Sequence, residues 1–244
     1  MSETQPYSKE WFEKQKHGAF KSAKIILPIV MDLVSPKSVV DVGCGVGMWL
    51  SCFQTLGVKD ILGIDGDYIK LEQLHIPKEN FLTIDISKPF NIDKKADLVM
   101  SLEVGEHLPD SSANSFVESI TKIAPVVLFS AAIPQQPGTA HINCQWPEYW
   151  ANLFKKFGYI PVDAIRRIVW TNSNVEYWYA QNTIIYVKES ELSKYPRLQK
   201  EIENGFSTTL PLVHPERYRY ALKPSPTIIF RIIRKLKKIF GLNS

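Results

Sequence analysis

A short apolar segment runs directly into a loop of alternating glycines near residue 43. Residues 39–42 (VVDV) predict a buried strand, and Gly43, Gly45 and Gly47 follow at once. Glycine allows the positive φ values of a tight turn and lets the backbone approach a ligand closely, while a helix after the loop offers its N-terminus to that ligand. The segment therefore predicts a strand, a ligand-binding turn and a helix.

Short β-branched runs and longer helical patterns alternate from residue 37 onward. The expected strands cover 38–42, 61–64, 81–84, 98–101 and 126–130, and the expected helices cover 48–56, 68–74, 113–123 and 147–157. Such alternation predicts an α/β fold with a mostly parallel sheet and helices on both faces. Two further runs, 164–170 and 182–187, flank the turn-rich residues 171–174 and predict an antiparallel pair at one sheet edge.

The segments on either side depart from this alternation. Apolar residues at helical spacing predict N-terminal helices over 8–34, with a kink or break at Pro28. Residues 189–225 are interrupted by prolines and are expected to be irregular, and residues 227–240 predict a separate helix. We therefore expect three parts, which are an N-terminal helical cap (1–36), a ligand-binding domain (37–190) and an extension (191–244) that ends in a basic amphipathic helix.

The charge of the chain is unevenly distributed. The net charge is +4, but the segment from Glu216 onward carries +7 and the residues before it carry −3. A slightly acidic body gives no indication of a nucleic-acid-binding surface. Three scattered cysteines, a polar start and no apolar run of the roughly 20 residues that span a bilayer favour a cytoplasmic location.

The glycine loop is compatible with two nucleotide-like ligands. A dinucleotide site has the pattern GxGxxG, but here the third glycine falls one residue early and Met48 takes the place reserved for glycine. The carboxylate of Asp41 would repel a pyrophosphate and attract a sulfonium or an α-ammonium group. The loop therefore favours S-adenosylmethionine, bound by Asp41, Gly43, Gly45 and Gly47.

Two more acids follow the next two expected strands. Asp65, with Gly66 after it, ends the second strand and can accept both hydroxyls of a ribose. Asp85 follows the third strand and can accept the adenine amino group, while Ile86 packs against the adenine ring. A dinucleotide would use Asp65 as well, so Asp65 alone does not distinguish the two ligands. Asp41, Asp65 and Asp85 together favour S-adenosylmethionine.

The chain resembles the class I S-adenosylmethionine-dependent methyltransferases. The resemblance rests on VVDVGCGVG, LGIDGDY, LTIDIS and ADLVMSLEVGEHLP, in this order, and covers roughly residues 20–187. It implies a Rossmann-like seven-stranded sheet with an antiparallel last strand, consistent with the edge pair, and S-adenosylmethionine as the cofactor. The segments LFSAAIP, HINCQWPEYW and WYAQN are similar to those of bacterial enzymes loosely associated with surface-glycan and other secondary biosynthesis.

The acceptor is expected outside the carboxyl ends of the fourth and fifth strands. Glu103, Glu106 and His107 are spaced i, i+3 and i+4, so they would face the same way on one helical turn. With His141 they can bind a divalent cation, as is implied by the similar ExxEH segment of small-RNA 3′-end and ubiquinone O-methyltransferases. Alternatively, Glu103 lines the cofactor pocket while Glu106 and His107 cap and pack.

His141 and His107 are the candidate catalytic residues. His141 follows the loop 134–138, where a general base is useful, and an imidazole with an ordinary pKa of about 6.5 suits that role. A loop histidine that is bonded to the backbone is the alternative.

Trp146, Tyr149 and Trp150 share helical spacing. They form either an aromatic wall for a sugar or the buried face of a helix; we expect Trp150 in the core and leave Trp146 open. Trp178 and Tyr179 have the same two interpretations.

The expected helix 227–240 has an apolar arc and a basic arc. Its basic residues are Arg231, Arg234, Lys235, Lys237 and Lys238. The pattern is typical of a helix on an anionic membrane, although docking onto its own domain or a dimer partner would also account for it.

Together these features predict a methyltransferase that acts on an oxygen of a sugar or lipid-linked glycan intermediate. The alternatives are metal-assisted 2′-O-methylation of RNA, which the acidic body disfavours, and a non-catalytic adenosylmethionine-binding scaffold.

Overall fold

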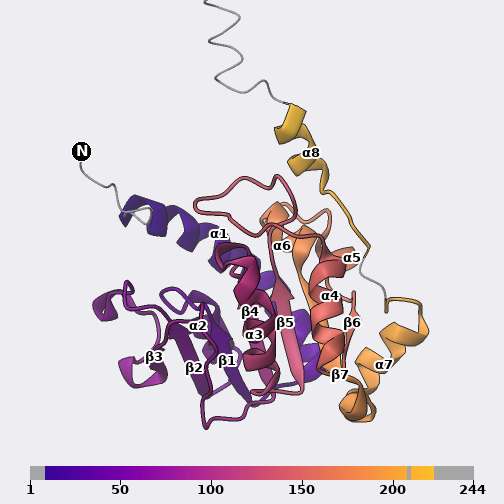
Figure 1. Cartoon of the computed structure of the whole chain (residues 1–244), viewed down its shortest axis with the longest axis horizontal. Helices are drawn as coiled ribbons and strands as arrows, with labels where there is room; N and C mark the ends of the chain where they lie inside the picture. Colours follow the sequence, from indigo (N-terminus) through magenta and orange to yellow (C-terminus); the bar gives the residue numbers. More distant parts are fainter. Residues whose placement is uncertain (1–8, 208–209, 223–244) are drawn as a thin grey trace, which may run out of the picture. The chain divides into compact units, whose positions relative to one another are not determined.

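The computed structural model describes residues 9–207 and 210–222 (Figure 1). The chain divides into two compact units, Met1–Leu212 and Val213–Ser244. The first unit holds the sheet, and within the second the structure describes α8 (Pro215–Leu222). The predicted domain boundaries at residues 36 and 190 lie inside the first unit, and a division there stays a prediction.

A seven-stranded sheet forms the centre of the first unit, in the order β3-β2-β1-β4-β5-β7-β6. Its strands are β1 (Ser38–Val42), β2 (Asp60–Asp65), β3 (Phe81–Thr83), β4 (Leu98–Leu102), β5 (Val126–Ser130), β6 (Tyr159–Val162) and β7 (Ile184–Lys188). Strands β1 to β5 pair in parallel, and β7 is antiparallel to both β5 and β6. The predicted fold class is confirmed, with the difference that the antiparallel strand lies next to the edge, which β6 forms.

Helices cover both faces of this sheet because the buried strands carry apolar side chains on both sides. In β1, Val39 belongs to one core cluster and Val40 to the other. The first cluster lies under α1 (Lys9–Val34) and α2 (Met48–Thr55), and the second under α3 (Asp110–Thr121) and α4 (Pro147–Lys156), which lie in front of the strands in Figure 1. The predicted helical segment 8–34 is a helix that continues through Pro28.

The predicted strand 164–170 is wrong. The edge strand is Tyr159–Val162, and the apolar run after it contains the short helix α5 (Arg166–Val169). Ile165 and Val169 are buried one turn apart while Ile168 is 49% exposed, which is a helical pattern of burial. Pro161 is tolerated in β6 because an edge strand can lack a backbone N–H.

Two other expectations need correction. Residues 68–74 were expected to form a helix and contain only the 3₁₀ turn η1 (Leu71–Gln73). The segment 189–225 is less irregular than expected, because it contains η4 (Glu189–Lys194), α7 (Pro196–Glu203) and α8. The remaining elements are η2 (Lys78–Asn80), η3 (Gly105–His107) and α6 (Tyr177–Asn182).

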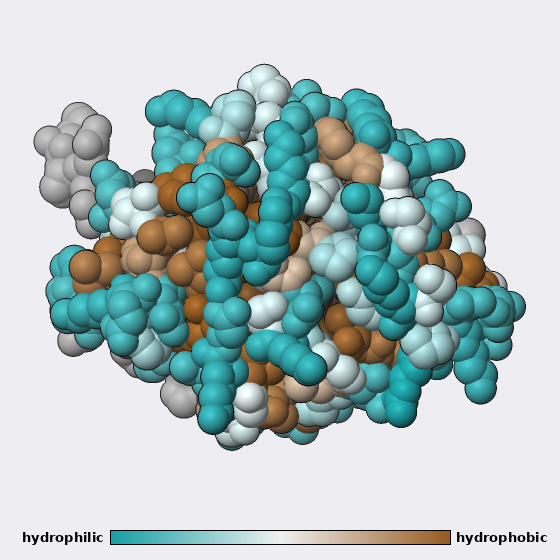
Figure 2. Space-filling view, turned by 90° about the horizontal axis from the view of Figure 1, so that it is seen from below, coloured by the Kyte–Doolittle hydropathy of each residue, from teal (hydrophilic) through white to brown (hydrophobic). Residues whose placement is uncertain are grey.

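The predicted basic helix 227–240 lies outside the described residues. Among the residues that are described, none of the helices has the length and apolar character needed to cross a membrane. The face shown in Figure 2 is largely hydrophilic, with smaller hydrophobic areas between the polar side chains.

Candidate active site

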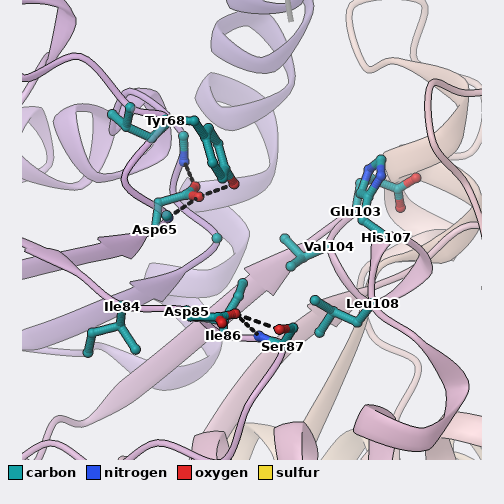
Figure 3. Close-up of a pocket in the computed structure, with 14 residues that line it drawn as sticks. Asp65, Tyr68, Ile84, Asp85, Ile86, Ser87, Glu103, Val104, His107 and Leu108 are labelled. Carbon is teal, nitrogen blue, oxygen red and sulfur yellow. Dashed lines mark hydrogen bonds between the residues drawn. The ribbon is translucent and has the colours of Figure 1, made fainter. Parts of the chain in front are cut away.

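A cavity of about 340 Å³ lies at the carboxyl ends of β1, β2, β3 and β4. Its lining residues are Gly43, Gly45, Asp65, Gly66, Tyr68, Ile69, Ile84, Asp85, Ile86, Ser87, Glu103, Val104, His107 and Leu108. The strand order reverses between β1 and β4, and ligands of open α/β sheets bind at such a switch point. In Figure 3, Asp65 and Tyr68 lie on one side of the cavity and Glu103 and His107 on the opposite side.

Asp65 ties the glycine loop to the end of β2. Its carboxylate accepts hydrogen bonds from the N–H groups of Gly45 (2.6 Å) and Gly66 (2.7 Å) and from the Tyr68 hydroxyl. Burial raises the pKa of Asp65, and these three hydrogen bonds oppose that effect. A buried acceptor at this edge fits the hydroxyls of a ribose, which are donors. The ring of Tyr68 lies beside Gly66. The sequence did not predict Tyr68 as a site residue, because a single exposed tyrosine belongs to no motif or periodic pattern.

The three glycines of the loop have different roles. All three have positive φ, of 82° at Gly43, 54° at Gly45 and 79° at Gly47. A Cβ at Gly43 would lie 2.4 Å from a Val104 methyl, whereas a Cβ at Gly45 would meet nothing within 4 Å. Gly43 thus permits close packing, and Gly45 leaves open space on the cavity side.

Asp41 and Gly47, both predicted to bind the cofactor, do not line this cavity. Gly47 faces Ile76, which a Cβ would approach to 2.9 Å. Asp41 is buried, and burial followed by the nearby charge of Asp65 raises the pKa of Asp41. A direct contact between Asp41 and the cofactor stays a prediction.

Asp85 and Ile86 also line the cavity. The Asp85 carboxylate is exposed and accepts hydrogen bonds from the backbone and hydroxyl of Ser87 (3.1 and 2.5 Å), and it pairs with Lys88 at 2.8 Å. The bond from Lys88 is the main reason that the pKa of Asp85 is lowered to about 2. Ile86 is buried at the cavity wall, where it can pack on a flat ring.

Glu103 follows β4 in a left-handed conformation, with φ of 55°. Its oxygens accept hydrogen bonds from the side-chain amides of Gln136 (2.8 Å) and Asn182 (3.0 Å), and its N–H donates to Ser130. Burial raises the pKa of Glu103. The prediction that Glu103, Glu106 and His107 share one helical turn is wrong, because η3 begins at Gly105.

Glu106, His107 and His141 are brought together by η3 and the loop after β5. One ligand atom from each lies within 4.8 Å of the others. The Glu106 carbonyl accepts hydrogen bonds from the N–H groups of Ile142 (2.9 Å) and Asn143 (3.0 Å), which hold the loop against η3. The two imidazole rings meet edge to face at 4.9 Å.

Burial lowers the pKa of both imidazoles, and at His107 the neighbouring His141 lowers it further. Burial also raises the pKa of Glu106, with the Glu103 carboxylate as a second cause. Burial thus favours the neutral form of both imidazoles and of both carboxyl groups in this cluster.

The aromatic residues after this loop divide between core and surface. Trp150 is buried against Phe129 and Gly105, which confirms its predicted place in the core. Trp146 is 40% exposed. Tyr179 is buried and packs edge to face on Trp49, so it belongs to the core.

A model of the methyltransferase domain family matches residues 15–172, which is more than half of the chain. The chain belongs to this family. This family uses S-adenosylmethionine as its cofactor. We expect the cofactor in the cavity at the glycine loop, where the placement of Asp65, Gly45 and Ile86 fits it.

Curated relatives of this chain include a putative methyltransferase of Invertebrate iridescent virus 6. It is 29% identical over 159 residues, which cover 61% of this chain and 59% of the relative. A probable chloroplastic tocopherol O-methyltransferase of Oryza sativa subsp. japonica is 34% identical over 99 residues, or 36% of this chain and 26% of the relative. The matches thus span less than two thirds of the length of either relative.

Two solved methyltransferases share the fold. The sugar N-methyltransferase KedS8 from Streptoalloteichus superposes with a TM-score of 0.60 at 12% identity and covers 77% of this chain and 95% of its own. Human N-acetylserotonin methyltransferase in complex with S-adenosylmethionine gives a TM-score of 0.52 at 15% identity and covers 73% of this chain and 55% of its own.

The contrast between Gly43 and Gly45 leads to a prediction. Gly45→Ala should leave the protein folded, because the left-handed backbone at this position costs an alanine only roughly 1 kcal/mol. It should lower the affinity for S-adenosylhomocysteine by about tenfold or more, because the new methyl group occupies space that the ligand needs. Gly43→Ala should reduce the yield of folded protein, since its Cβ overlaps Val104. Thermal melts with and without the ligand measure both effects; equal behaviour of the two variants would contradict the assignment.

Proposed function

We propose that the protein transfers the methyl group of S-adenosylmethionine to a hydroxyl oxygen of a sugar or a lipid-linked glycan intermediate. The observation that carries this proposal is the pair of imidazoles beside the cofactor cavity. His107 lines the cavity itself, and His141 packs against His107. When bound, the cofactor supplies an electrophilic methyl group, and a hydroxyl that attacks it must lose its proton.

The hydrogen bonds of both rings favour such a role. Nδ1 of His107 lies 3.3 Å from the Ala140 carbonyl, and Nδ1 of His141 lies 3.2 Å from the Gln136 carbonyl. Because a carbonyl oxygen only accepts, these two contacts favour the tautomer that carries the hydrogen on Nδ1 and a lone pair on Nε2. These Nε2 atoms are the groups through which the protein would act on the acceptor hydroxyl.

Support for a sugar acceptor comes from the loop that carries His141. Ile142 and Trp146 expose apolar surface there. An exposed indole has a flat face for the apolar side of a sugar ring. The sequence similarity to glycan-associated enzymes points the same way.

Transfer of a labelled methyl group to a panel of nucleotide sugars and lipid-linked sugars tests the proposal. We expect an O-methylated product, no product from the matched deoxy sugar, and a roughly 100-fold lower kcat in His141→Asn. The control is His75→Asn, the same change at an exposed histidine outside the cluster. Methylation of RNA or of amino groups alone would refute the proposed acceptor.

We further propose that residues 227–240 hold the protein at an anionic membrane surface, where a lipid-linked acceptor resides. Support comes from the sequence alone, through the apolar arc and the five basic residues of this segment. Flotation with anionic vesicles should carry the protein upward, and replacing the five basic residues by glutamine should abolish this. Equal flotation of both proteins would overturn the proposal.

A further inference from the structure

Gln136 lies between the wall of the cofactor cavity and the loop that carries His141. Its side-chain Nε2 donates to Oε2 of Glu103 at 2.8 Å, and Glu103 lines the cavity (Figure 3). Its backbone carbonyl oxygen lies 3.2 Å from Nδ1 of His141 and can accept a hydrogen bond from it. One buried residue is therefore within bonding distance of both the cavity wall and a candidate catalytic residue.

The buried amides around Gln136 form a network that fixes its side chain. Oε1 of Gln136 accepts from Nε2 of Gln181 (3.1 Å) and from Nδ2 of Asn182 (3.0 Å). Asn182 also donates to Oε1 of Glu103, at 3.0 Å, and accepts from Gln181 at 2.9 Å. Because all three amide residues are buried, a bond lost here leaves a polar group without a partner, which costs about 1–3 kcal/mol. The network therefore resists independent movement of Gln136 and Glu103.

The backbone on both sides of this contact has a conformation that residues other than glycine rarely adopt. Glu103, Gln135 and Ala140 have φ of 55°, 64° and 56°, and they are three of the four such residues in the described part of the chain. A backbone of this kind costs about 1–3 kcal/mol per residue and persists only where its surroundings hold it. The loop 135–140 is therefore held in place by its contacts.

The position of this loop decides how the imidazole of His141 is presented. A Cβ at Gly138 would lie 1.9 Å from Nε2 of His141, so the backbone of Gly138 packs directly against this nitrogen. The carbonyl of Gln136 lies beside the other ring nitrogen. A shift of residues 136–138 would therefore change both the direction of the ring and the access to Nε2.

We propose that Gln136 is a positioning residue that couples an occupied cofactor cavity to His141. A ligand that fills the cavity restrains Glu103 in its wall, Glu103 holds the amide of Gln136, and Gln136 fixes the loop against the imidazole. Binding of the cofactor thus orders the acceptor side of the site. The part that His141 plays toward the acceptor rests on the proposed function, whereas the coupling between cavity and loop does not.

Hydrogen–deuterium exchange of the full chain, with and without S-adenosylhomocysteine, tests the coupling. The N–H groups of Ile142 and Asn143 donate to the Glu106 carbonyl, so their exchange requires the loop to leave η3. In the wild-type protein, saturating ligand should slow this exchange by about fivefold or more, which is the lower end of typical coupling between two sites. Exchange in β6, at the far edge of the sheet, reports any general stabilisation by the ligand.

Gln136→Ala should remove most of the ligand effect on Ile142 and Asn143. The substitution deletes the link to Glu103 and leaves room for water to bond the remaining amides. Its affinity for S-adenosylhomocysteine, measured by calorimetry, should stay within about fivefold of wild type and shows that the variant is folded. If this variant does not bind the ligand, Gln136→Met replaces it, because methionine fills the space without a hydrogen bond to Glu103.

Gln135→Ala is the matched control, since Gln135 is the exposed neighbour in the same loop. The ligand should slow loop exchange in this variant as much as in wild type. Kinetics with the sugar acceptor add a readout that lost stability alone would not move. In Gln136→Ala, kcat should fall by about tenfold or more through misplacement of His141, while KM for S-adenosylmethionine stays within about fivefold.

The wild-type protein alone can overturn the proposal, if the ligand binds and the exchange of Ile142 and Asn143 does not change. An equal ligand effect in Gln136→Ala and Gln135→Ala, or an unchanged kcat in Gln136→Ala, would also refute it. Sugar methylation without the coupling would leave the proposed function intact. Coupling in a protein that methylates no sugar would refute the proposed function and leave the link through Gln136 standing.

Discussion

Asp65→Ala is expected to lower the affinity for S-adenosylmethionine by about 100-fold, or about 2.8 kcal/mol. The substitution removes the acceptor for the ribose hydroxyls, and hydrogen bonds to a charged group contribute roughly 1.5–3 kcal/mol each. It also releases the N–H groups of Gly45 and Gly66, which the carboxylate holds at 2.6 and 2.7 Å. Equilibrium dialysis with labelled cofactor measures the loss.

Asp67→Asn is the matched control, since Asp67 is an exposed acid two residues away that does not line the cavity. Its affinity should stay within about twofold of wild type. If Asp65→Ala binds the cofactor as tightly as the control, Asp65 does not hold the ribose.

Arg166→Ala should destabilise the fold by roughly 3–5 kcal/mol, because it leaves the buried Asp163 without its partner. The Arg166 side chain is 1% exposed and makes two bonds to the Asp163 carboxylate, at 2.9 and 2.6 Å. It also donates to the carbonyls of Gln181 (3.3 Å) and Leu210 (2.9 Å). Urea denaturation followed by circular dichroism gives the change in unfolding free energy.

The neighbouring Arg167 supplies the comparison. Its side chain is 41% exposed and pairs with Glu201 at the surface. An exposed ion pair contributes at most about 1 kcal/mol, so Arg167→Ala should cost far less than Arg166→Ala. Equal losses of unfolding free energy in the two variants would show that the buried Arg166–Asp163 pair stabilises the fold no more than the exposed pair does.

The strands and the cofactor loop were predictable because their signals are local. Residues 39–42 and Gly43 lie next to one another in sequence, and the acids Asp65 and Asp85 are placed by the ends of parallel strands. The edge strand was not predictable in the same way. Pro161 argues against a strand in sequence, and only the edge position of β6 makes it acceptable.

The polar environment of the acceptor side was predictable in part. His107 and His141 were both candidate catalytic residues, and their rings meet in the structure. The placement of Glu103 depends on its positive φ after β4, which residue spacing does not reveal. The amides that bind Glu103 come from Gln136 and Asn182, 33 and 79 residues farther along the chain. Contacts over such separations are set by the order of strands in the sheet and leave no periodic signal.

Calorimetric titration of the full chain with S-adenosylhomocysteine, with NADH titrated in parallel, tests the central claim most directly. We predict one S-adenosylhomocysteine bound per chain and no heat of binding from NADH, because the loop has Met48 in place of the third glycine of a dinucleotide site. Failure to bind S-adenosylhomocysteine, or tighter binding of NADH, would contradict the assignment of the cavity to S-adenosylmethionine.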